Sequence, residues 1–589
     1  MRAARRQLVL RLFSRNSLTL TAALGTASAL ALSAAAFAAS NEGTNQSSGN
    51  SGAQTSSSAG PSAQDLINSQ NDASNWILPA GDYSGNRQVK EKEIGPSNVD
   101  QMQVAWTFNI PKNGPIESSP IVWDGTIYIT SNQDDVYAVD AKTGDLKWQY
   151  NPKPEQIVGF PRNRGVAIYE GKLFIGMING HLAALDAKTG KELWNKQTVE
   201  NTKDSFYTMQ PVPYKGKILL GVSDGDWGGN GNISAFNPDN GDRIWQFNTI
   251  PGPGEKGHDS WEGDSWKRGG GAVWQGVAID PSSDTLYIDA GNPQPDFLGE
   301  ERKGDNLYTD SMIAVDISGD KPQMKWYHQF VAHDTHDWDP AMPPVLFTGK
   351  VDGKETKLVA AGDKAGNFWI VKAENGDLVS HTPVSYQLNQ DTHPALNGSN
   401  IACPNTNGGV EFNGGSYDPA TNMFFVASSN QCGKWSAEDK AVWVAGQFYL
   451  GGSFPSLVGP NTGWFTAIDV STGAPAWRHH LDLPANGGAL VMDYSASRRP
   501  QENESIVFSG TLDGKFNAYK ADTGKILWQY DTGASIIAPP VTFTMDNKRY
   551  VLVNSGDPGF LKVPELKSAI GPAHLTAFVA GSQKAASSQ

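Results

Sequence analysis

The sequence predicts an all-β chain, folded as an eight-bladed β-propeller of four-stranded antiparallel blades. Three observations support this prediction: the glycine and aromatic content, a recurring hairpin pattern, and the length of the chain. Of 589 residues, 63 are glycine and 18 are tryptophan. Abundant glycine with abundant aromatic residues is typical of short strands joined by tight turns. A chain of this length must either divide into several domains or grow by repetition.

The repeated unit is a short apolar strand ending in Asp or Asn, a Thr-Gly or Asn-Gly turn, and a second strand that closes on Trp. Its clearest copy is Val136–Asp140, then Thr143-Gly144, then Trp148. Alternating apolar residues can bury one strand face, glycine supplies the positive φ of the turn, and the indole can pack between neighbouring sheets. The other copies begin with the strands Leu182 to Asp186, Ile233 to Asn237, Met312 to Asp316, Phe368 to Lys372, Phe465 to Asp469 and Phe516 to Lys520.

Seven copies are visible, and the long interval between Lys372 and Asp469 leaves room for an eighth, degenerate copy around Ser416–Ser429. Four-stranded units of roughly 45–55 residues have the size of propeller blades, which close radially and leave only short sheet edges. An open solenoid is the alternative, but no capping repeat is evident. The blades by themselves indicate no chemistry, because one scaffold serves many functions.

The two ends of the chain differ from the repeats. Residues 1–38 carry five arginines and no acid, then an apolar stretch, and end in Ala36-Phe37-Ala38, which is typical of a secretory signal peptide. An uncleaved membrane anchor is the alternative. Residues 39–70 are expected to form a flexible Ser/Gly/Asn-rich linker, 71–575 the propeller and 576–589 a disordered tail. We therefore expect a periplasmic protein with no transmembrane segment after the signal peptide.

Net charge and cysteine content reduce the number of possible functions. The formal net charge of −14 argues against nucleic-acid binding, because phosphate recognition needs clustered cations. Cys403 and Cys432 are the two cysteines, and in an exported protein they are expected to form a structural disulfide. The sequence has no Cys-x-x-Cys-His motif for covalent haem, so electrons from a redox reaction would have to leave to another protein.

Three segments interrupt the repeat and are polar where a strand should be apolar. They are residues 221–228, residues 261–274, and Gly291-Asn292-Pro293 followed by residues 333–340. They contain the motifs Trp-x-Gly-Asp-x-Trp-Lys-x-Gly-Gly-Gly-x-x-Trp, Gly-Asn-Pro and His-Asp-x-x-Asp-Trp-Asp, and Asp-Lys-x-Gly follows at Asp363. From about Ala80 to about Gly556, the chain resembles the quinoprotein alcohol dehydrogenases of the methanol/ethanol dehydrogenase type, which hold pyrroloquinoline quinone (PQQ) and a divalent metal.

The resemblance implies a metal ion held by Asp226, Asn292 and Asp339. Hard oxygen ligands of this kind suit Ca²⁺, which takes six to eight oxygens. The family usually has Glu where this chain has Asp226, so the carboxylate reaches one methylene less far. Lanthanide-dependent relatives carry an extra Asp at the position of Ala341, and its replacement by an uncharged residue favours calcium.

The resemblance also implies the catalytic roles. Asp339 would be the general base that takes the substrate hydroxyl proton while a hydride passes to the quinone. Lys364 would hydrogen-bond the quinone oxygens, and Trp274 would be the surface on which the quinone stacks. The other expected cofactor-binding residues are Glu117, Arg164, Thr208, Ser223 and Glu411.

Three positions depart from the family pattern. Relatives stack the quinone against a ring formed by two adjacent cysteines, whereas this chain reads Ile157-Val158-Gly159-Phe160 there, so Val158, Gly159 or Phe160 would meet one quinone face. Glu411 stands where many relatives have Asn, and a carboxylate would repel a reduced quinone unless it were protonated or paired. Asn486 stands where relatives often carry Trp, so methanol or ethanol specificity does not carry over.

These observations favour an exported PQQ- and Ca²⁺-dependent dehydrogenase that oxidises an alcohol and passes electrons to an external cytochrome c or quinone. Two alternatives from other classes lack the cofactor. One is a binding scaffold like the outer-membrane assembly factors built on the same repeat, and the other is an enzyme like the tetrathionate hydrolases.

Overall fold

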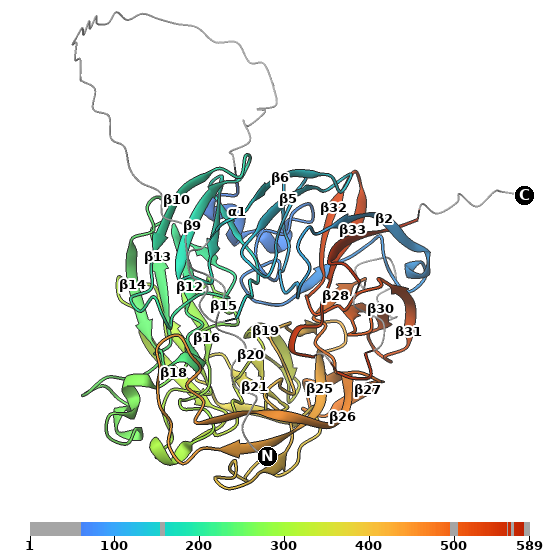
Figure 1. Cartoon of the computed structure of the whole chain (residues 1–589). Helices are drawn as coiled ribbons and strands as arrows, with labels where there is room; N and C mark the ends of the chain where they lie inside the picture. The colour runs from blue at the N-terminus through green and yellow to red at the C-terminus, as the bar shows by residue number, and fades with distance from the viewer. Residues whose placement is uncertain (1–59, 154–159, 495–504, 562, 567–570, 582–589) are drawn as a thin grey trace, which may run out of the picture. The chain divides into compact units, whose positions relative to one another are not determined.

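The fold was obtained as a computed structural model, which describes residues 60–153, 160–494, 505–561, 563–566 and 571–581. The predicted signal peptide, residues 1–38, lies outside these described residues. Within them, eight β-sheets follow one another around a ring in the unit Ser57–Gln589 (Figure 1). The all-β prediction and the eight-bladed propeller are therefore confirmed.

The first four sheets follow the chain directly, each with four antiparallel strands. The first contains β3 (Ile121–Trp123), β4 (Thr126–Thr130), β5 (Val136–Asp140) and β6 (Leu146–Tyr150); the second contains β7 (Ala167–Tyr169), β8 (Lys172–Gly176), β9 (His181–Asp186) and β10 (Glu192–Gln197). The third contains β11 (Val212–Tyr214), β12 (Lys217–Gly221), β13 (Asn232–Phe236) and β14 (Arg243–Asn248); the fourth contains β15 (Val277–Asp280), β16 (Thr285–Ala290), β17 (Ser311–Asp316) and β18 (Gln323–Gln329).

The remaining sheets are less regular. The fifth contains β19 (Val345–Val351), β20 (Lys354–Gly362), β21 (Asn367–Lys372) and β22 (Leu378–Pro383). The sixth contains β23 (Asn400–Ala402), β24 (Ser416–Asp418), β25 (Met423–Ala437), β26 (Gly452–Asp469) and β27 (Pro475–Leu481). The seventh contains β28 (Ala489–Asp493), β29 (Ile506–Gly510), β30 (Lys515–Lys520) and β31 (Ile526–Asp531), with β1 (Gln88–Lys90) added in parallel to β28. The separate eighth copy expected around Ser416–Ser429 was wrong: these residues form β24 and part of β25 in the sixth sheet, which already contains the copy that begins at Phe465. The sixth and seventh sheets each have five strands rather than four.

The eighth sheet closes the ring. It combines β32 (Val541–Met545), β33 (Lys548–Ser555) and β34 (His574–Ala580) with β2 (Met102–Asn109), which comes from the other end of the propeller sequence. Because β2 pairs with β34, strands from both ends of the propeller sequence share one sheet, and this pairing closes the ring. The start of the predicted tail, residues 576–589, is wrong. β34 runs to Ala580, and residues 576–580 pair with β2 and β33.

The predicted linker, residues 39–70, is also wrong at its end. The short helix α1 (Ala63–Ile67) has a capping box in which Ser62 and Asp65 satisfy each other's backbone N–H groups. Leu66 is fully buried in the core beside the second and third sheets. Burial of this leucine fixes a segment whose composition alone suggested a flexible chain.

Tryptophan joins each of several blades to the next one. The indole N–H groups of Trp106, Trp148, Trp194, Trp326 and Trp477 donate to backbone carbonyls in the turn of the following blade at 2.9–3.2 Å. The glycine of that turn lies against the indole face, so that a Cβ on Gly190 would stand 2.4 Å from Trp148. The glycine is therefore needed for close approach as well as for positive φ.

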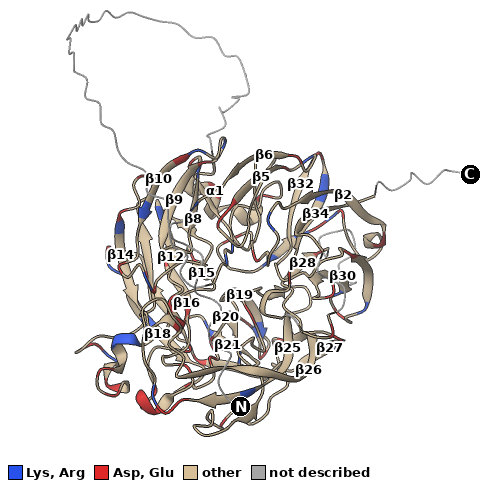
Figure 2. Ribbon diagram, viewed as in Figure 1, with Lys and Arg blue, Asp and Glu red and all other residues tan. Residues whose placement is uncertain are grey.

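Charged positions are interspersed around the ring rather than gathered into one basic strip (Figure 2). In the part of the chain that the structure describes, no helix has the length and apolar character to cross a membrane.

Candidate active site

Loops from several blades enclose a cavity of about 510 Å³. Every side chain that the sequence predicts for catalysis, cofactor binding or metal binding lines it. These residues are Glu117, Arg164, Thr208, Ser223, Asp226, Trp274, Asn292, Asp339, Lys364 and Glu411. The structure thus gathers in one place residues that lie far apart in the sequence.

The glycine triplet Gly269–Gly271 holds the loops of the site together. Gly271 N–H donates to the Asn292 carbonyl at 2.9 Å, and Gly231 N–H donates to the Gly270 carbonyl at 2.8 Å. A Cβ on Gly231 would stand 1.8 Å from the Gly271 oxygen, which leaves no room for a side chain. The backbone contact fixes Asn292 and, three residues after the triplet, Trp274.

Three groups contact the carboxylate of Asp339 in the cavity. Its Oδ1 accepts hydrogen bonds from the Asn292 N–H at 2.8 Å and from the Trp274 indole at 3.4 Å, and its Oδ2 lies 2.5 Å from Lys364 Nζ. Burial acts to raise the pKa of Asp339, but Lys364, Asp337 and the Asn292 N–H outweigh it and hold the pKa below the ordinary 3.8. The side chain is therefore an ionised acceptor at neutral pH.

Lys364 stands between two acids. Its Nζ is 2.7 Å from Asp337 Oδ1 as well as 2.5 Å from Asp339, and it lies 5.6 Å from the centre of the Trp274 ring. Burial acts to lower the pKa of Lys364, yet Asp337 and Asp339 raise it well above its usual range. Asp337 is held at φ 59°, a conformation that Asp tolerates better than most residues, and this backbone turns its carboxylate toward Lys364.

A buried arginine fixes the loop that carries Asp339. Arg302 is fully buried; it donates to the carbonyls of Asp296, at 3.1 Å, and of Asp334. Asp334 in turn accepts from the His336 N–H at 2.8 Å and the Trp338 N–H at 2.7 Å. Arg302 thereby links the loop after Asn292 to the loop before Asp339.

Asp226 lines the cavity from the third blade. It lies on the short helix η3 (Gly225–Trp227), and its carbonyl accepts the Tyr449 N–H at 2.8 Å. Burial raises the pKa of Asp226 to about 6, Lys364 lowers it, and the like charge of Asp339 raises it again. Asp226, Asn292 and Asp339 all line the same cavity.

Arg164 forms the polar wall beside Trp274. Its guanidinium lies 4.8 Å from the centre of the Trp274 ring and 4.4 Å from that of Phe412, forms an ion pair with Glu117 at 3.0 Å, and donates to Thr208 Oγ1 at 2.6 Å. Thr208 also bonds Ser223 through their hydroxyls at 2.8 Å. Arg162, which sequence reasoning missed, holds the second oxygen of Glu117 at 2.8 Å.

The departures from the family pattern also lie at the cavity. Phe160 and Asn486 line it; Val158 and Gly159 fall outside the described residues. Phe160 belongs to an aromatic cluster, with ring centres 5.4 Å from Trp227, 5.0 Å from Phe448 and 4.6 Å from Phe560. Burial raises the pKa of Glu411 to about 7, and the nearby Lys364 acts against it.

The long hairpin of β25 and β26 was not foreseen. It belongs to the sixth sheet, but residues at its tip bond the third-blade loop of the site: the Trp443 indole donates to the Trp227 carbonyl at 3.0 Å (Figure 1). Phe454, Pro455 and Leu457 of β26 line the cavity. The repeat pattern does not predict this hairpin, because its strands have 15 and 18 residues, whereas the strands of the recognised copies have five or six.

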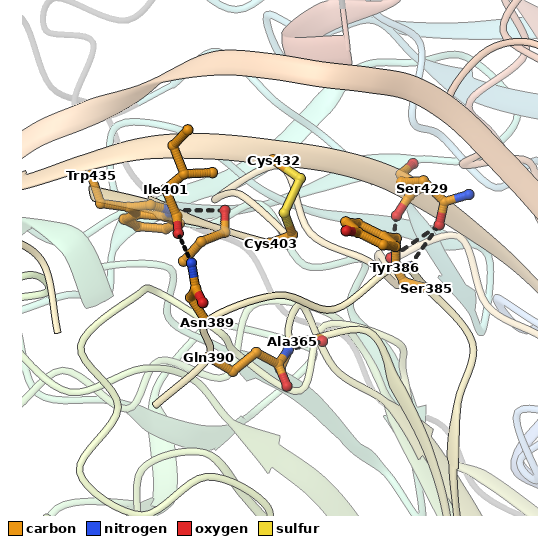
Figure 3. Close-up of a disulfide and its surroundings, with 12 residues drawn as sticks. Ala365, Ser385, Tyr386, Asn389, Gln390, Ile401, Cys403, Ser429, Cys432 and Trp435 are labelled. Carbon is orange, nitrogen blue, oxygen red and sulfur yellow. Dashed lines mark hydrogen bonds between the residues drawn. A yellow bond between two sulfur atoms is a disulfide. The ribbon is translucent and has the colours of Figure 1, made fainter. Parts of the chain in front are cut away.

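The expected disulfide joins Cys403 to Cys432 on β25 (Figure 3). It anchors the segment that follows β22 and packs on the turn carrying Lys364. In that segment, Gln390 donates to the Ala365 carbonyl at 2.7 Å, and Gln387 donates to the same oxygen at 3.1 Å. The disulfide therefore supports a structural element that holds Lys364 in place.

Comparison with known proteins identifies the family. The model of the glucose/ethanol/alcohol dehydrogenase PQQ β-propeller domain matches residues 76–387 and 379–551. The chain belongs to the PQQ-dependent alcohol dehydrogenase family. This family assignment makes it an oxidoreductase that acts on CH–OH groups.

Several quinoprotein dehydrogenases are similar over most of their length. The quinohemoprotein alcohol dehydrogenase of Comamonas testosteroni is 30% identical over 527 residues, covering 82% of this chain and 72% of the relative. The lanthanide-dependent methanol dehydrogenase of Methylacidiphilum fumariolicum is 30% identical over 549 residues, covering 85% and 87%. The solved structure of the quinohemoprotein alcohol dehydrogenase ADHIIG from Pseudomonas putida HK5 superposes with a TM-score of 0.80 at 27% identity, covering 89% and 82%.

The residues of this quinoprotein fit PQQ and a metal ion. Asp226, Asn292 and Asp339 offer oxygen donors at one end of the cavity, which is the donor chemistry of a hard cation. The indole of Trp274 borders the same cavity as a flat surface, and Arg164 and Lys364 supply cationic donors for carboxylate and quinone oxygens. The cavity thus has an oxygen-rich end and a stacking surface with cations beside it.

Proposed function

We propose that the chain is an exported PQQ- and calcium-dependent dehydrogenase that oxidises an alcohol and passes the electrons to an external acceptor. The observation that carries the proposal is the convergence of Asp226, Asn292, Asp339, Lys364 and Trp274 on one cavity. A cofactor-free scaffold has no need for a buried lysine between two buried acids, because such groups lose their hydration without a compensating task.

Asp339 acts as the general base. Its lowered pKa keeps it ionised, and it borders the cavity within reach of an alcohol hydroxyl. Lys364 and the Asn292 N–H hold the carboxylate in one orientation while the proton is transferred. When bound, PQQ supplies the two-electron acceptor for the reaction.

The remaining polar residues of the cavity would bind and orient the cofactor. Arg164 would pair with a cofactor carboxylate, with Thr208 and Ser223 as hydroxyl donors beside it, while Glu117 keeps the guanidinium in place. The Trp274 ring would support one face of the quinone, and Phe160 is available on the cavity wall for an edge or face contact.

Two observations favour calcium as the bound ion: the oxygen donors of the site and the uncharged side chain of Ala341. Asp226, Asn292 and Asp339 are oxygen donors, and the uncharged Ala341 leaves the loop after Asp339 without an extra carboxylate. Export is supported by the arginine-rich, apolar composition of residues 1–38. Because the sequence lacks a covalent haem motif, the electron acceptor would be a separate cytochrome c or quinone.

The test is reconstitution of the purified chain with PQQ and Ca²⁺. We expect quinone absorbance to be retained after gel filtration, and artificial dye to be reduced with a panel of primary and secondary alcohols. Asp339→Asn should retain the quinone and lose turnover by about a thousandfold or more, because the general base is gone. A chain that retains no quinone would instead support a cofactor-free propeller, and a fully active Asp339→Asn protein would refute the role of the base.

A further inference from the structure

Aromatic side chains form a wall of the cavity. Its members are Phe160, Phe206, Trp227, Phe454 and Phe560, and they are called the aromatic wall below. The ring centres of Phe206 and Phe160 lie 4.9 Å and 5.4 Å from that of Trp227. The ring centre of Phe560 lies 4.6 Å from that of Phe160. Rings at these separations pack against one another, so the wall is continuous from Trp227 to Phe560.

The aromatic wall belongs to the same cavity as the proposed general base. Trp227 follows Asp226 directly in η3, and both side chains line the cavity together with Asp339. Ligand pockets of proteins combine an apolar lining with a few polar groups that fix the orientation of the ligand. An alcohol that presents its hydroxyl to Asp339 therefore shares the cavity with the aromatic wall.

Two members of the wall are half exposed. Phe454 is 45% exposed on β26, and Phe560 is 51% exposed on the short helix η7 (Gly559–Leu561). Phe448 connects Phe454 to the rest of the wall, because its ring centre lies 5.0 Å from that of Phe454 and 4.3 Å from that of Trp227. A ligand with a hydrocarbon group would remove the exposed faces of Phe454 and Phe560 from water.

Two polar groups beside Phe560 are already bound to the protein. The amide nitrogen of Asn407 donates to the Phe560 carbonyl at 3.2 Å. The guanidinium of Arg162 is paired with Glu117 at 2.8 Å and lies 4.6 Å from the centre of the Phe560 ring. A further hydroxyl of a polyol would lose its hydration here without a matching gain, so this part of the cavity suits hydrocarbon.

We propose that the substrate is an alcohol whose hydroxyl-bearing carbon carries a large apolar group, of the size of a hexyl chain or a phenyl ring, and that the aromatic wall binds this group. The inference rests on the proposed function, because it names the substrate class of the same dehydrogenase site. Each methylene that packs on the wall leaves water and strengthens binding. Methanol and ethanol have little apolar surface to bury, so they gain little from the wall.

The first measurement is the substrate profile of the full chain loaded with PQQ and Ca²⁺. Dye-linked kcat/KM is determined for ethanol, n-butanol, n-hexanol, benzyl alcohol and glycerol. Because every buried methylene favours the bound state, kcat/KM should rise along the series and be about a hundredfold higher for n-hexanol than for ethanol. Glycerol should fall below ethanol, because its extra hydroxyls meet an apolar wall.

Binding is measured separately from turnover. Tertiary alcohols have no hydrogen on the hydroxyl-bearing carbon and so cannot be oxidised to a carbonyl. Cumyl alcohol carries a phenyl group where tert-butanol carries a methyl group. In calorimetric titrations of the loaded chain, the dissociation constant should be about fiftyfold lower for cumyl alcohol than for tert-butanol.

Phe454→Ala and Phe560→Ala each remove one half-exposed ring, from two different elements. Either variant should lower the ratio of kcat/KM for n-hexanol to that for ethanol by about tenfold. Val444→Ala is the matched control: Val444 lies between β25 and β26 and is 44% exposed, and among the described residues it stands outside the lining of this cavity. Its ratio should equal that of the wild type. If Phe454→Ala does not accumulate as folded protein, Phe560→Ala carries the test.

The outcomes separate this inference from the proposed function. A wild type that retains PQQ and oxidises alcohols, but has a kcat/KM for ethanol equal to or above that for n-hexanol, overturns the inference and leaves the proposed function standing. A wild type that retains no PQQ and oxidises no alcohol overturns both.

The variants give two further results that would overturn the inference alone. One is an equal fall of the ratio in Val444→Ala, because the effect would then come from the hairpin in general. The other is an unchanged ratio in Phe454→Ala and Phe560→Ala with slower reduction of added cytochrome c, which would show that the two rings dock a protein acceptor.

Discussion

The turns between strands within a blade differ from the loops that form the cavity. In a blade turn, a tryptophan of one sheet lies on a glycine of the next and donates to a nearby carbonyl, as Trp194 does to Pro238 at 3.2 Å. The same short pattern recurs around the ring. In the cavity loops, the partners do not recur: Lys364 pairs with Asp337 and Asp339, and Arg302 donates to three backbone carbonyls.

This difference implies that the blade turns contribute mainly to stability and the cavity loops mainly to chemistry. Blade turns bury apolar rings with a single satisfied hydrogen bond each, so each stabilises the fold by itself. The cavity loops bury charges that depend on one another, and several of them raise each other's pKa. Substitutions in the two kinds of segment should therefore change different measured quantities: unfolding for the blade turns, turnover and ligand binding for the cavity.

Among the substitutions that compare the two regions, the largest effect is expected from Gly291→Ala in the cavity. A Cβ at this position would stand 2.3 Å from Asp339 Oδ1, so the carboxylate must move. Displacement of a general base by about 1 Å is enough to lower turnover by roughly a hundredfold. Dye-linked turnover of the PQQ- and Ca²⁺-loaded variant measures the loss. Turnover within twofold of the wild type would contradict the placement of Asp339.

Gly190→Ala is the corresponding change in a blade turn. Gly190 has φ +72°, and its Cβ would stand 2.4 Å from the Trp148 ring, so the substitution combines backbone strain with a clash. We expect a loss of about 3 kcal/mol in the free energy of unfolding, measured by denaturant titration. Turnover of the protein that remains folded should stay near that of the wild type. A loss of turnover without a loss of stability would contradict the distinction between the two regions.

The blade pattern could be predicted from sequence because it is local. The strand, turn and tryptophan of one copy lie within about a dozen residues, and the same pattern recurs along the chain. The copy Val136–Trp148 could therefore be recognised without knowing which segments lie beside it. The eighth blade could not be predicted in this way, because β2 comes from one end of the propeller sequence and β32, β33 and β34 come from the other. The sixth sheet was mistaken for two blades because its strands β25 and β26 are elongated.

The cavity could be predicted only where motifs resemble those of a family. Asp226, Asn292 and Asp339 come from three different loops, and nothing in their local sequences says that they meet. Arg302 belongs to no motif that was recognised; its importance depends on burial and on a partner 32 residues away, the Asp334 carbonyl. Contacts of this kind can be recognised only in the folded structure, because the spacing of residues along the sequence does not reveal them.

A smaller effect is expected from Glu411→Gln, and it depends on pH. Burial raises the pKa of Glu411 from the ordinary 4.5 to about 7, so the ionised side chain opposes folding. This destabilisation is absent below pH 4.5, grows as pH rises, and is complete above about pH 7. Without PQQ, the variant should be more stable than the wild type by about 2 kcal/mol at pH 8 and equally stable at pH 4.

Glu411→Asp serves as the control, because it keeps the charge. Its stability should fall with rising pH as that of the wild type does. The measurement is denaturant unfolding at both pH values for all three proteins. A Glu411→Gln protein whose advantage is the same at pH 4 and pH 8 would show that packing, and not ionisation, accounts for the change.

The smallest effect is expected from Trp194→Phe. Phenylalanine keeps a ring against Gly241 but loses the indole N–H that donates to the Pro238 carbonyl at 3.2 Å. One hydrogen bond contributes about 1 kcal/mol to stability, so denaturant unfolding should show a loss of that size with turnover unchanged. Trp194→Ala, which also removes the ring contact, should cost more. If both variants were equally stable, the glycine contact would contribute nothing and the hydrogen bond alone would join these two blades.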